Sequence, residues 1–423
     1  MARFKAPRGT RDVLPSEQPY WRYVKGRAEA QARLFGYQPV DTPLFEDAAL
    51  FVRGVGLGTD IVEKEMYVLE DRGGDRLALR PEGTAPVCRA YLEHGMYNLP
   101  QPVRLYYVCP IFRYERPQAG RYRQHYQFGV ECLGDEDALV DAEVIELAWS
   151  FVASLGLRGI VLCINSIGDR SCRPAYVEAL KAHYLGRLKD VCPDCRMRFE
   201  RSPLRVLDCK RTDFACQEMA AEAPNSLQFL CADCGHRWKA LLGYLASLEI
   251  PYEVDTRLVR GLDYYTRTVF EIQPLVARAQ GTVLAGGRYD GLIEELGGPP
   301  TPGIGFGSGI ERLIENLKAQ GVTPTDYKGV EAVVAWIGDA ARQEAVKLSA
   351  SLKRQGISTL LAPTSKSLKG QMRYASAQGA RYVLILGEEE LSQGTVVVRE
   401  MAKGEQKPVE RAALLGYLTS GTV

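Results

Sequence analysis

The sequence predicts an α+β protein in which a large domain built on an antiparallel sheet is interrupted by a helical insert and followed by a small α/β domain. Three observations indicate this organisation: a long polar-faced hairpin at residues 104–134, a cysteine-rich helical stretch at about 170–245, and alternating apolar strands and helices beyond residue 330. Because 423 residues exceed one ordinary domain, we expect domains at 1–325 and 330–423, joined by a polar linker.

The hairpin combines two strands of period two with a polar tip. Residues 104–112 alternate, and the returning strand places His125, Gln127, Gly129 and Glu131 on one face, with aromatic and aliphatic residues on the other. A carboxylate and an amide beside a glycine predict the floor of a site for a small polar substrate. Arginines at the tip suit a polyphosphate, because guanidinium groups are planar, permanently charged donors. The alternative is an edge hairpin whose polar face is simply solvated.

Composition sets limits on location and partners. No apolar run approaches about 20 residues, so we expect no membrane span, and the N-terminal stretch lacks the apolar core of a secretory signal. With eleven cysteines and no export signal, a disulfide framework is not expected, and a cytoplasmic location follows. A net charge of +1 neither supports nor excludes an RNA partner.

The first hundred residues predict a helix, an extended segment and a small hairpin. The helix begins near Ser16, a candidate N-cap, and ends at Gly36. An extended proline-containing segment, 37–45, is followed by strands at 66–69 and 77–79. The sequence RPEGT at 80–84 then opens a helix, where Glu82 is either a helix cap or a ligand for substrate.

The cysteine-rich stretch holds seven of the eleven cysteines, including two CxxC pairs. Two such pairs in a cytosolic chain are typical of a four-thiolate zinc site, here Cys192, Cys195, Cys231 and Cys234. However, 35 residues separate the pairs, against about 15–20 in a compact ribbon, and Cys209 and Cys216 are competing ligands. We therefore expect an insert that folds without zinc, with this site as the alternative.

Two further stretches carry candidate binding residues. Residues 258–271, LVRGLDYYTRTVFE, place Arg260 beside Tyr264 and Tyr265, although paired tyrosines are usually core residues. Residues 303–313, GIGFGSGIERL, run a strand with glycine at every second position into a helix. Such glycines clear one strand face for a flat ring, and Arg312 in the first helical turn can reach a phosphate.

Several of these stretches resemble the histidyl-tRNA synthetase family of class II aminoacyl-tRNA synthetases. FRYERPQAGRYRQ followed by FGVE resembles motif 2, RGLDYYTRTVFE resembles a peptide typical of the family, and GIGFGSGIERL resembles motif 3. YQPVDTPLF with its preceding helix resembles motif 1, which in the family forms a homodimer interface. SLKGQMRYASAQGARYVLILGEEEL, from residue 367, resembles the anticodon-binding domain. The expected fold is therefore a class II synthetase-like catalytic domain with a C-terminal α/β anticodon-binding domain.

The resemblance implies a histidine–tRNA ligase, which uses ATP and Mg²⁺ to convert L-histidine to histidyl-adenylate and transfers it to the 3′ end of tRNA(His). Positions matching the family's motifs imply catalytic residues Arg260 and Arg113, with ATP bound by Arg113, Arg121 and Arg312. The implied histidine ligands are Glu82, Thr84, Gln127, Glu131, Tyr264 and Tyr265. We expect Glu131 to set specificity, because a buried carboxylate accepts from an imidazole N–H and is left unmet by an apolar amino acid.

Two other functions remain open from the sequence. One is the synthetase-like regulatory subunit of ATP phosphoribosyltransferase, which binds histidine without charging tRNA, typically lacks the C-terminal domain and departs from the RGLDYYTRTVFE peptide. The other is a zinc-ribbon nucleic-acid-binding module, which explains the cysteine-rich insert but assigns no role to the rest of the chain.

Overall fold

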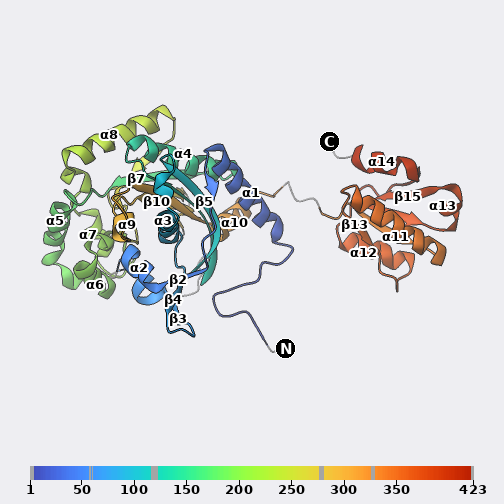
Figure 1. The fold of residues 1–423 in the computed structure, drawn as a ribbon, viewed down its shortest axis with the longest axis horizontal. Coiled ribbons are helices and arrows are strands. Elements are labelled where there is room, and N and C mark those ends of the chain that lie inside the picture. Colours follow the sequence, from blue (N-terminus) through green and yellow to red (C-terminus); the bar gives the residue numbers. More distant parts are fainter. Residues whose placement is uncertain are drawn as a thin grey trace. The chain divides into compact units, whose positions relative to one another are not determined.

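The computed structural model describes residues 4–56, 59, 61–115, 122–275, 281–324 and 329–420. Contacts divide the chain into two compact units, Met1–Pro324 and Thr325–Val423 (Figure 1).

The first unit is built on an eight-stranded sheet in the order β1-β5-β6-β11-β10-β9-β7-β8. The six central strands are antiparallel to their neighbours, whereas the two edge strands pair in parallel. The strands are β1 (Gln38–Pro39), β5 (Val103–Phe112), β6 (Gln124–Leu133), β7 (Ile160–Ser166), β8 (Tyr252–Val254), β9 (Thr266–Pro274), β10 (Leu284–Arg288) and β11 (Gly303–Gly309). The expected antiparallel sheet is confirmed.

A hydrophobic core lies on each face of this sheet, because successive side chains of a strand point to opposite faces. On one face, Phe128 and Val130 of β6 pack with helices α1 (Gln18–Leu34), α4 (Ala138–Ser154) and α10 (Ile310–Ala319). On the other, Leu105 and Ile111 of β5 pack with α2 (Ala48–Val55), α3 (Thr84–Glu93) and α9 (Leu292–Glu295). The polar residues of β6 share this second side, as its alternation predicts.

Helix α1 confirms one predicted terminus and corrects the other. The chain turns out of the helix at Gly36, whose φ of 76° is readily adopted only by glycine. Ser16 is not the N-cap. The helix begins at Gln18, its N-cap is Glu17, and no side chain caps it. Ser16 instead lies in the turn that precedes the helix.

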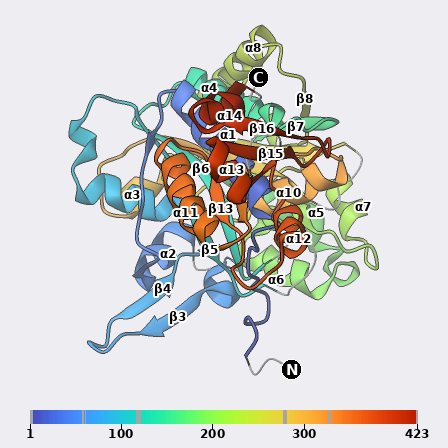
Figure 2. The same cartoon turned by 90° about the vertical axis from the view of Figure 1, so that its right-hand side faces the viewer.

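A second, three-stranded antiparallel sheet, β2-β4-β3, extends from the first unit (Figure 2). Strands β3 (Tyr67–Glu70) and β4 (Arg76–Leu79) form the predicted hairpin, and β2 (Phe45–Asp47) pairs with β4. A π-helical turn, η1 (Ile61–Glu65), precedes the hairpin, and a 3-10 turn, η2 (Met96–Asn98), follows α3.

The insert is helical, as predicted, and lies beside one end of the large sheet in Figure 1. Its longer helices are α5 (Arg173–Leu185), α6 (Pro193–Arg201), α7 (Cys216–Ala221) and α8 (Ala232–Ser247). Short 3-10 turns join them: η3 (Leu188–Asp190), η4 (Pro203–Asp208) and η5 (Ser226–Phe229).

The second unit contains a mixed five-stranded sheet in the order β13-β12-β14-β15-β16. Its elements are β12 (Ala332–Trp336), α11 (Asp339–Arg354), β13 (Thr359–Leu361), α12 (Leu368–Ala377), β14 (Tyr382–Leu386), α13 (Glu388–Gln393), β15 (Thr395–Glu400), β16 (Gln406–Glu410), η6 (Arg411–Ala413) and α14 (Leu414–Ser420). The α/β pattern is confirmed, but the sequence suggests one helix over 408–418. Its first part is instead strand β16, where Pro408 is tolerated at the sheet edge.

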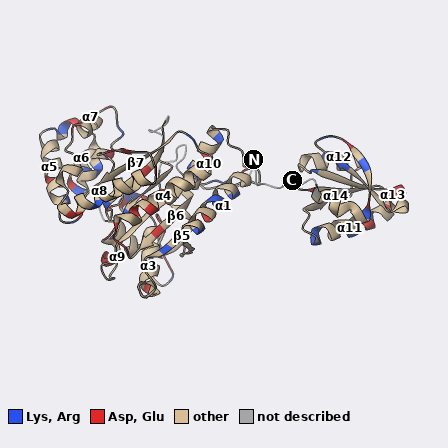
Figure 3. Cartoon of the chain, turned by 90° about the horizontal axis from the view of Figure 1, so that it is seen from above, with Lys and Arg blue, Asp and Glu red and all other residues tan. Residues whose placement is uncertain are grey.

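Figure 3 shows that acidic and basic residues are interspersed along the helices of both units, in keeping with the net charge of +1. Among the described residues, no helix combines the length and apolar character needed to cross a membrane.

Candidate active site

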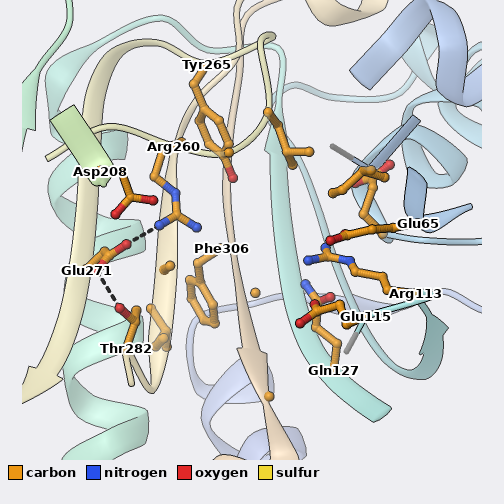
Figure 4. A pocket seen from close by; sticks show the side chains of 18 of the residues that line it. Glu65, Arg113, Glu115, Gln127, Asp208, Arg260, Tyr265, Glu271, Thr282 and Phe306 are labelled. Atoms are coloured by element: carbon orange, nitrogen blue, oxygen red, sulfur yellow. Dashed lines mark hydrogen bonds and ion pairs between the residues drawn. The ribbon is translucent and has the colours of Figure 1, made fainter. Parts of the chain in front are cut away.

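A cavity of about 700 Å³ opens in the first unit, on the face of the sheet where the polar residues of β6 lie. Figure 4 shows two groups of side chains facing one another across it, with Phe306 of β11 between them. Arg113, Gln127 and Glu115 from the hairpin form one group, and Arg260, Glu271 and Asp208 form the other. Three segments distant in sequence, the hairpin, the insert and β9, therefore line one site.

Glu131 lies at the base of the cavity and is only 1% exposed. Its Oε1 accepts hydrogen bonds from Thr84 Oγ1 at 2.8 Å and from Tyr107 Oη at 3.1 Å, and its Oε2 accepts one from Tyr289 Oη. Thr84 and Tyr289 line the cavity, whereas Glu131 lies just behind them. Burial raises the pKa of Glu131 to about 8, against the lowering effect of the hydroxyl groups.

Glycines make room for this network. Gly305 of β11 pairs with Glu131 in the sheet register, and a Cβ on Gly305 would lie 2.2 Å from Glu131 Oε2 and 2.3 Å from the Val130 carbonyl oxygen. Similarly, a Cβ on Gly129 would lie 2.4 Å from the Tyr107 hydroxyl oxygen. The alternating glycines predicted to clear a strand face do so, and carboxylate and phenol side chains use part of that space.

Glu82 caps helix α3, the simpler of the two roles that the sequence allows. Its carboxylate accepts hydrogen bonds from the backbone N–H groups of Thr84 and Ala85 at 2.7 and 2.8 Å. Burial raises the pKa of Glu82, while these N–H groups and nearby Arg113 lower it. Glu82 and Arg113 also line the cavity, and Arg113 is held by a 2.7 Å hydrogen bond from Nε to the Pro81 carbonyl oxygen. The cap therefore also places a carboxylate in the cavity wall.

Arg260 lines the opposite wall and pairs with Glu271 of β9. Glu271 also accepts hydrogen bonds from Thr282 Oγ1 and from Gln273 Nε2. The buried Nε of Arg260 has no hydrogen-bond partner among the described residues. The guanidinium is thus fixed on one side by Glu271 and retains donor capacity for a bound group.

The two other arginines predicted to bind ATP are Arg312 and Arg121. Arg312 of α10 lines the cavity and donates from Nη1 to the Thr282 carbonyl oxygen at 3.0 Å. Arg121 lies outside the described residues.

His125 and Gln127 of β6 also line the cavity, and burial together with the charge of Arg113 lowers the pKa of His125 to about 3. His125 is therefore a neutral ring at physiological pH.

Three tyrosines form an aromatic corner of the cavity. Tyr264 and Tyr265 come immediately before β9, with ring centroids 4.7 Å apart, and Tyr289 stands edge-on to Tyr264 with a centroid distance of 5.7 Å. All three are buried and all three line the cavity. The sequence-predicted residues from the hairpin, from RPEGT and from the LVRGLDYYTRTVFE stretch are thus brought together.

Tyr107 and Tyr289 belong to the network around Glu131 but are absent from the sequence-based set. The signal for Tyr107 was the strand pairing, since β5 sets it opposite Gly129, between Gln127 and Glu131. Tyr289 lies in AGGRYDG, which the sequence suggests is a glycine-rich turn. Its first part is instead strand β10 in the centre of the sheet, and Tyr289 follows it.

The cysteines do not form the four-thiolate set suggested by the two CxxC pairs. Cys192 and Cys195 cluster with Cys209 and Cys216, whereas Cys231 and Cys234 cluster with Cys172 and Asp169. The predicted ligand set of Cys192, Cys195, Cys231 and Cys234 was therefore wrong. The two pairs belong to different helices, α6 and α8, and spacing along the sequence does not show that these helices hold the pairs apart.

Comparison with known proteins identifies the relatives of this chain. The sequence profile of histidyl-tRNA synthetase matches residues 9–313, and that of an anticodon binding domain matches residues 331–420. The histidine–tRNA ligase of Dehalococcoides mccartyi is 54% identical over 96% of this chain and 97% of its own length, and that of Pelotomaculum thermopropionicum is 48% identical over 97% and 96%. The crystal structure of apo histidyl-tRNA synthetase from Staphylococcus aureus superposes with a TM-score of 0.82 at 37% identity, covering 98% of this chain and 99% of that one. The chain belongs to the histidyl-tRNA synthetase family.

Proposed function

We propose that this protein activates L-histidine with ATP and transfers it to the 3′ end of tRNA(His). The observation that carries the proposal is the set of charged groups at one cavity, which is lined by buried Glu82 and by Arg113, Arg260 and Arg312. Buried Glu131 lies directly behind Thr84 and Tyr289 in the cavity wall. Carboxylates suit an ammonium group and an imidazole N–H, whereas guanidinium groups suit phosphates and a carboxylate. Both reactants of an adenylation are thereby matched within one cavity.

At the amino-acid end, Glu82, Thr84 and Gln127 bind the α-ammonium group. Tyr264 and Tyr265 line the imidazole pocket, and the carboxyl group of Glu131 defines its polarity. Two hydroxyls already occupy Oε1 of Glu131. Among the residues that the structure describes, Oε2 accepts a hydrogen bond only from Tyr289, so one acceptor position remains for a ring N–H. An apolar amino acid leaves that position unmet, which gives a physical basis for specificity.

At the nucleotide end, Arg113 and Arg260 stabilise the charge that grows on the α-phosphoryl oxygens, and Arg312 with Arg121 binds the outer phosphates. The nucleotide enters as its Mg²⁺ complex, in which the ion retains water and phosphate oxygens as ligands. No side chain must act as a nucleophile, because the histidine carboxylate itself attacks the α-phosphorus, and the bond from that phosphorus to the bridging oxygen breaks to release pyrophosphate. The protein's contribution is positioning and electrostatic stabilisation.

The second step of the reaction, the transfer of histidine to tRNA, also requires the second unit of the chain. A separate α/β unit of the anticodon-binding family, within residues 330–423, reads tRNA(His). The adenylate held in the first unit, within residues 1–325, then passes its histidyl group to the terminal adenosine. The reaction belongs to the translation apparatus, and a cytoplasmic location is part of the proposal.

The proposal includes a homodimer. Strand β1, the segment that resembles motif 1, lies at the edge of the large sheet. Close to it in sequence, Leu34, Leu44 and Phe45 are exposed apolar side chains, which a subunit interface would cover. Sedimentation equilibrium is expected to give twice the chain mass of 46.9 kDa, and a monomer at micromolar concentration would contradict this part.

Histidine-dependent ATP–pyrophosphate exchange tests the activation step. We expect exchange with histidine and not with the other standard amino acids, followed by aminoacylation of tRNA(His). A Glu131→Ala variant is expected to lose histidine-dependent exchange by at least about 100-fold, because the variant loses the buried carboxyl group that hydrogen-bonds the imidazole ring, and an unmet buried polar group costs specificity of this order. Circular dichroism controls for folding. Undiminished exchange in a folded variant would remove Glu131 from the site.

The same assay separates the regulatory alternative. A regulatory subunit would bind histidine but catalyse no exchange, and the alternative predicts a chain without the C-terminal unit. The anticodon-binding match over residues 331–420 and the full-length similarity to histidine–tRNA ligases favour the synthetase.

A further inference from the structure

We propose that Cys192, Cys195, Cys209 and Cys216 bind a structural Zn²⁺ ion that fixes the insert-side wall of the cavity. The four side chains are buried, and each offers a sulfur within 4.8 Å of the other three. They come from three adjoining elements: Cys192 and Cys195 at the start of α6, Cys209 directly after η4, and Cys216 at the start of α7. This inference is independent of the reaction proposed above.

The spacing of the sulfurs suits one tetrahedral ion. A zinc ion about 2.3 Å from each of four sulfurs places neighbouring sulfurs about 3.8 Å apart. The Sγ atoms of Cys192 and Cys209 are 3.8 Å apart. Small adjustments of the other thiol rotamers would complete the tetrahedron, because all four sulfurs already lie within 4.8 Å of one another.

Backbone N–H groups already point at these sulfurs. The N–H of Cys195 donates to Cys192 Sγ at 3.4 Å, and the N–H of Cys192 donates to Cys216 Sγ at 3.2 Å. Such donors stabilise the negative charge of thiolates and fix the orientation of metal ligands. Apolar packing of neutral thiols would need none of them.

The second cluster of the insert provides a contrast. Asp169 there is already engaged, since it accepts hydrogen bonds from the N–H and Oγ of Ser171 and pairs with Arg267 at 3.4 Å. Cys231 is also only half-buried. A carboxylate already bound to a guanidinium and hydroxyl is a poorer ligand than a free thiolate, so the inference is confined to the four-cysteine cluster.

The four-cysteine cluster lies beside the insert-side wall of the cavity, and this position indicates that the zinc ion stabilises that wall. Cys209 itself lines the cavity, as do Arg205 and Asp208 on one side of it and Lys210 and Arg211 on the other. Helix α6 contributes Arg198 to the same wall. Arg198 lies on α6, Arg205 and Asp208 lie on η4, and Lys210 and Arg211 lie between η4 and α7. These elements are only six to nine residues long, which is too short to hold a fixed shape alone. Bonds from one ion to three segments would hold them in place.

Metal analysis of the purified full-length chain tests the inference. After dialysis against a weak chelator, inductively coupled plasma mass spectrometry is expected to find zinc, and Cys209→Ser is expected to lose about one equivalent relative to wild type. Cys231→Ser is the matched control from the second cluster, and it is expected to keep the zinc bound at the four-cysteine site. Wild-type protein with under about a tenth of an equivalent, or Cys209→Ser with undiminished zinc, would overturn the inference.

X-ray absorption at the zinc edge gives a readout that does not depend on the folding of Cys209→Ser. In the Cys231→Ser protein, the spectrum is expected to show only sulfur neighbours, four of them at about 2.3 Å. Nitrogen or oxygen neighbours there would place the ion elsewhere and overturn the assignment.

Discussion

On the sheet side of the cavity, Glu82 and Glu131 are 3% and 1% exposed, whereas on the insert side the side chains of Asp208 and Lys210 are 48% and 68% exposed. The sheet-side carboxylates accept hydrogen bonds from fixed backbone and hydroxyl groups. The insert-side pair is separated by 4.0 Å and faces solvent. Groups that must discriminate are thus buried, Glu131 on strand β6 and Glu82 at the start of helix α3, where desolvation strengthens each interaction. Groups on the insert contribute charge in water and are screened.

The largest effect is expected for Arg260, which pairs with Glu271 of strand β9. Arg260→Gln removes a buried guanidinium aimed at the developing phosphoryl charge, so the exchange rate should fall by about 1,000-fold. Arg257→Gln is the matched control, because Arg257 is half exposed and pairs with Asp255 at 3.7 Å. Equal activity in both variants would contradict a role for Arg260 in the chemistry.

The ionisation of Glu131 should make stability depend on pH. Its pKa is raised to about 8, against about 4.3 in an unfolded chain. Between these values the native state binds a proton that the unfolded state has lost, so the free energy of unfolding falls as pH rises. Glu131→Gln cannot ionise, and from pH 6 to pH 8 it should gain about 2 kcal/mol relative to wild type. Urea unfolding at several pH values measures this difference, and parallel curves for the two proteins would contradict the burial of the charge.

Two glycines of β11 differ in the space around them, and replacing each with alanine tests the effect of that difference. Gly305→Ala is expected to lower the free energy of unfolding by about 1–3 kcal/mol and to reduce histidine binding, because its Cβ would collide with the Val130 carbonyl oxygen and Glu131. Gly309→Ala should be nearly neutral, because among the described residues no atom outside its chain neighbours lies within 4 Å of the added Cβ. Chemical denaturation and histidine titration measure both. Equal stability of the two variants would mean that the strands can separate to accept the methyl group.

The smallest effect is expected on the insert side. Lys210→Ala removes an exposed cation in a 4.0 Å ion pair with Asp208, and such pairs contribute no more than about 1 kcal/mol. The KM values for ATP and histidine should change by less than about fivefold. A loss comparable to that of Arg260→Gln would mean that the insert contributes to the chemistry as strongly as the sheet.

The sequence was informative where periodicity or a long motif constrained the chain. The alternation in 124–132 correctly separated Gln127 and Glu131 from Phe128 and Val130, because a strand has only two faces. Glu82 and Arg260 were found because they lie in long, specific motifs. Their presence along one cavity was implied by the resemblance and could not be derived from spacing.

The wrong and missing predictions share one physical cause. Contacts with residues distant in sequence decide the structure wherever the local sequence is compatible with more than one. Tyr107 joins Glu131 through strand register, and the four clustered cysteines meet through helix packing. Ser16 has good capping chemistry, but the helix starts after it. Residues 406–410 form a strand because they pair with the free edge of β15, and the secondary-structure propensity of these residues alone does not predict that pairing.

The most direct test of the account is a crystal structure of the protein with histidine and a non-hydrolysable ATP analogue. We predict one histidine in the cavity, with its ammonium group bound to Glu82 and Gln127, its ring directed at Glu131 and Tyr264, and its carboxylate near Arg260 and the α-phosphate. A histidine bound elsewhere, with Glu82 and Glu131 contacting neither end of it, would contradict the account.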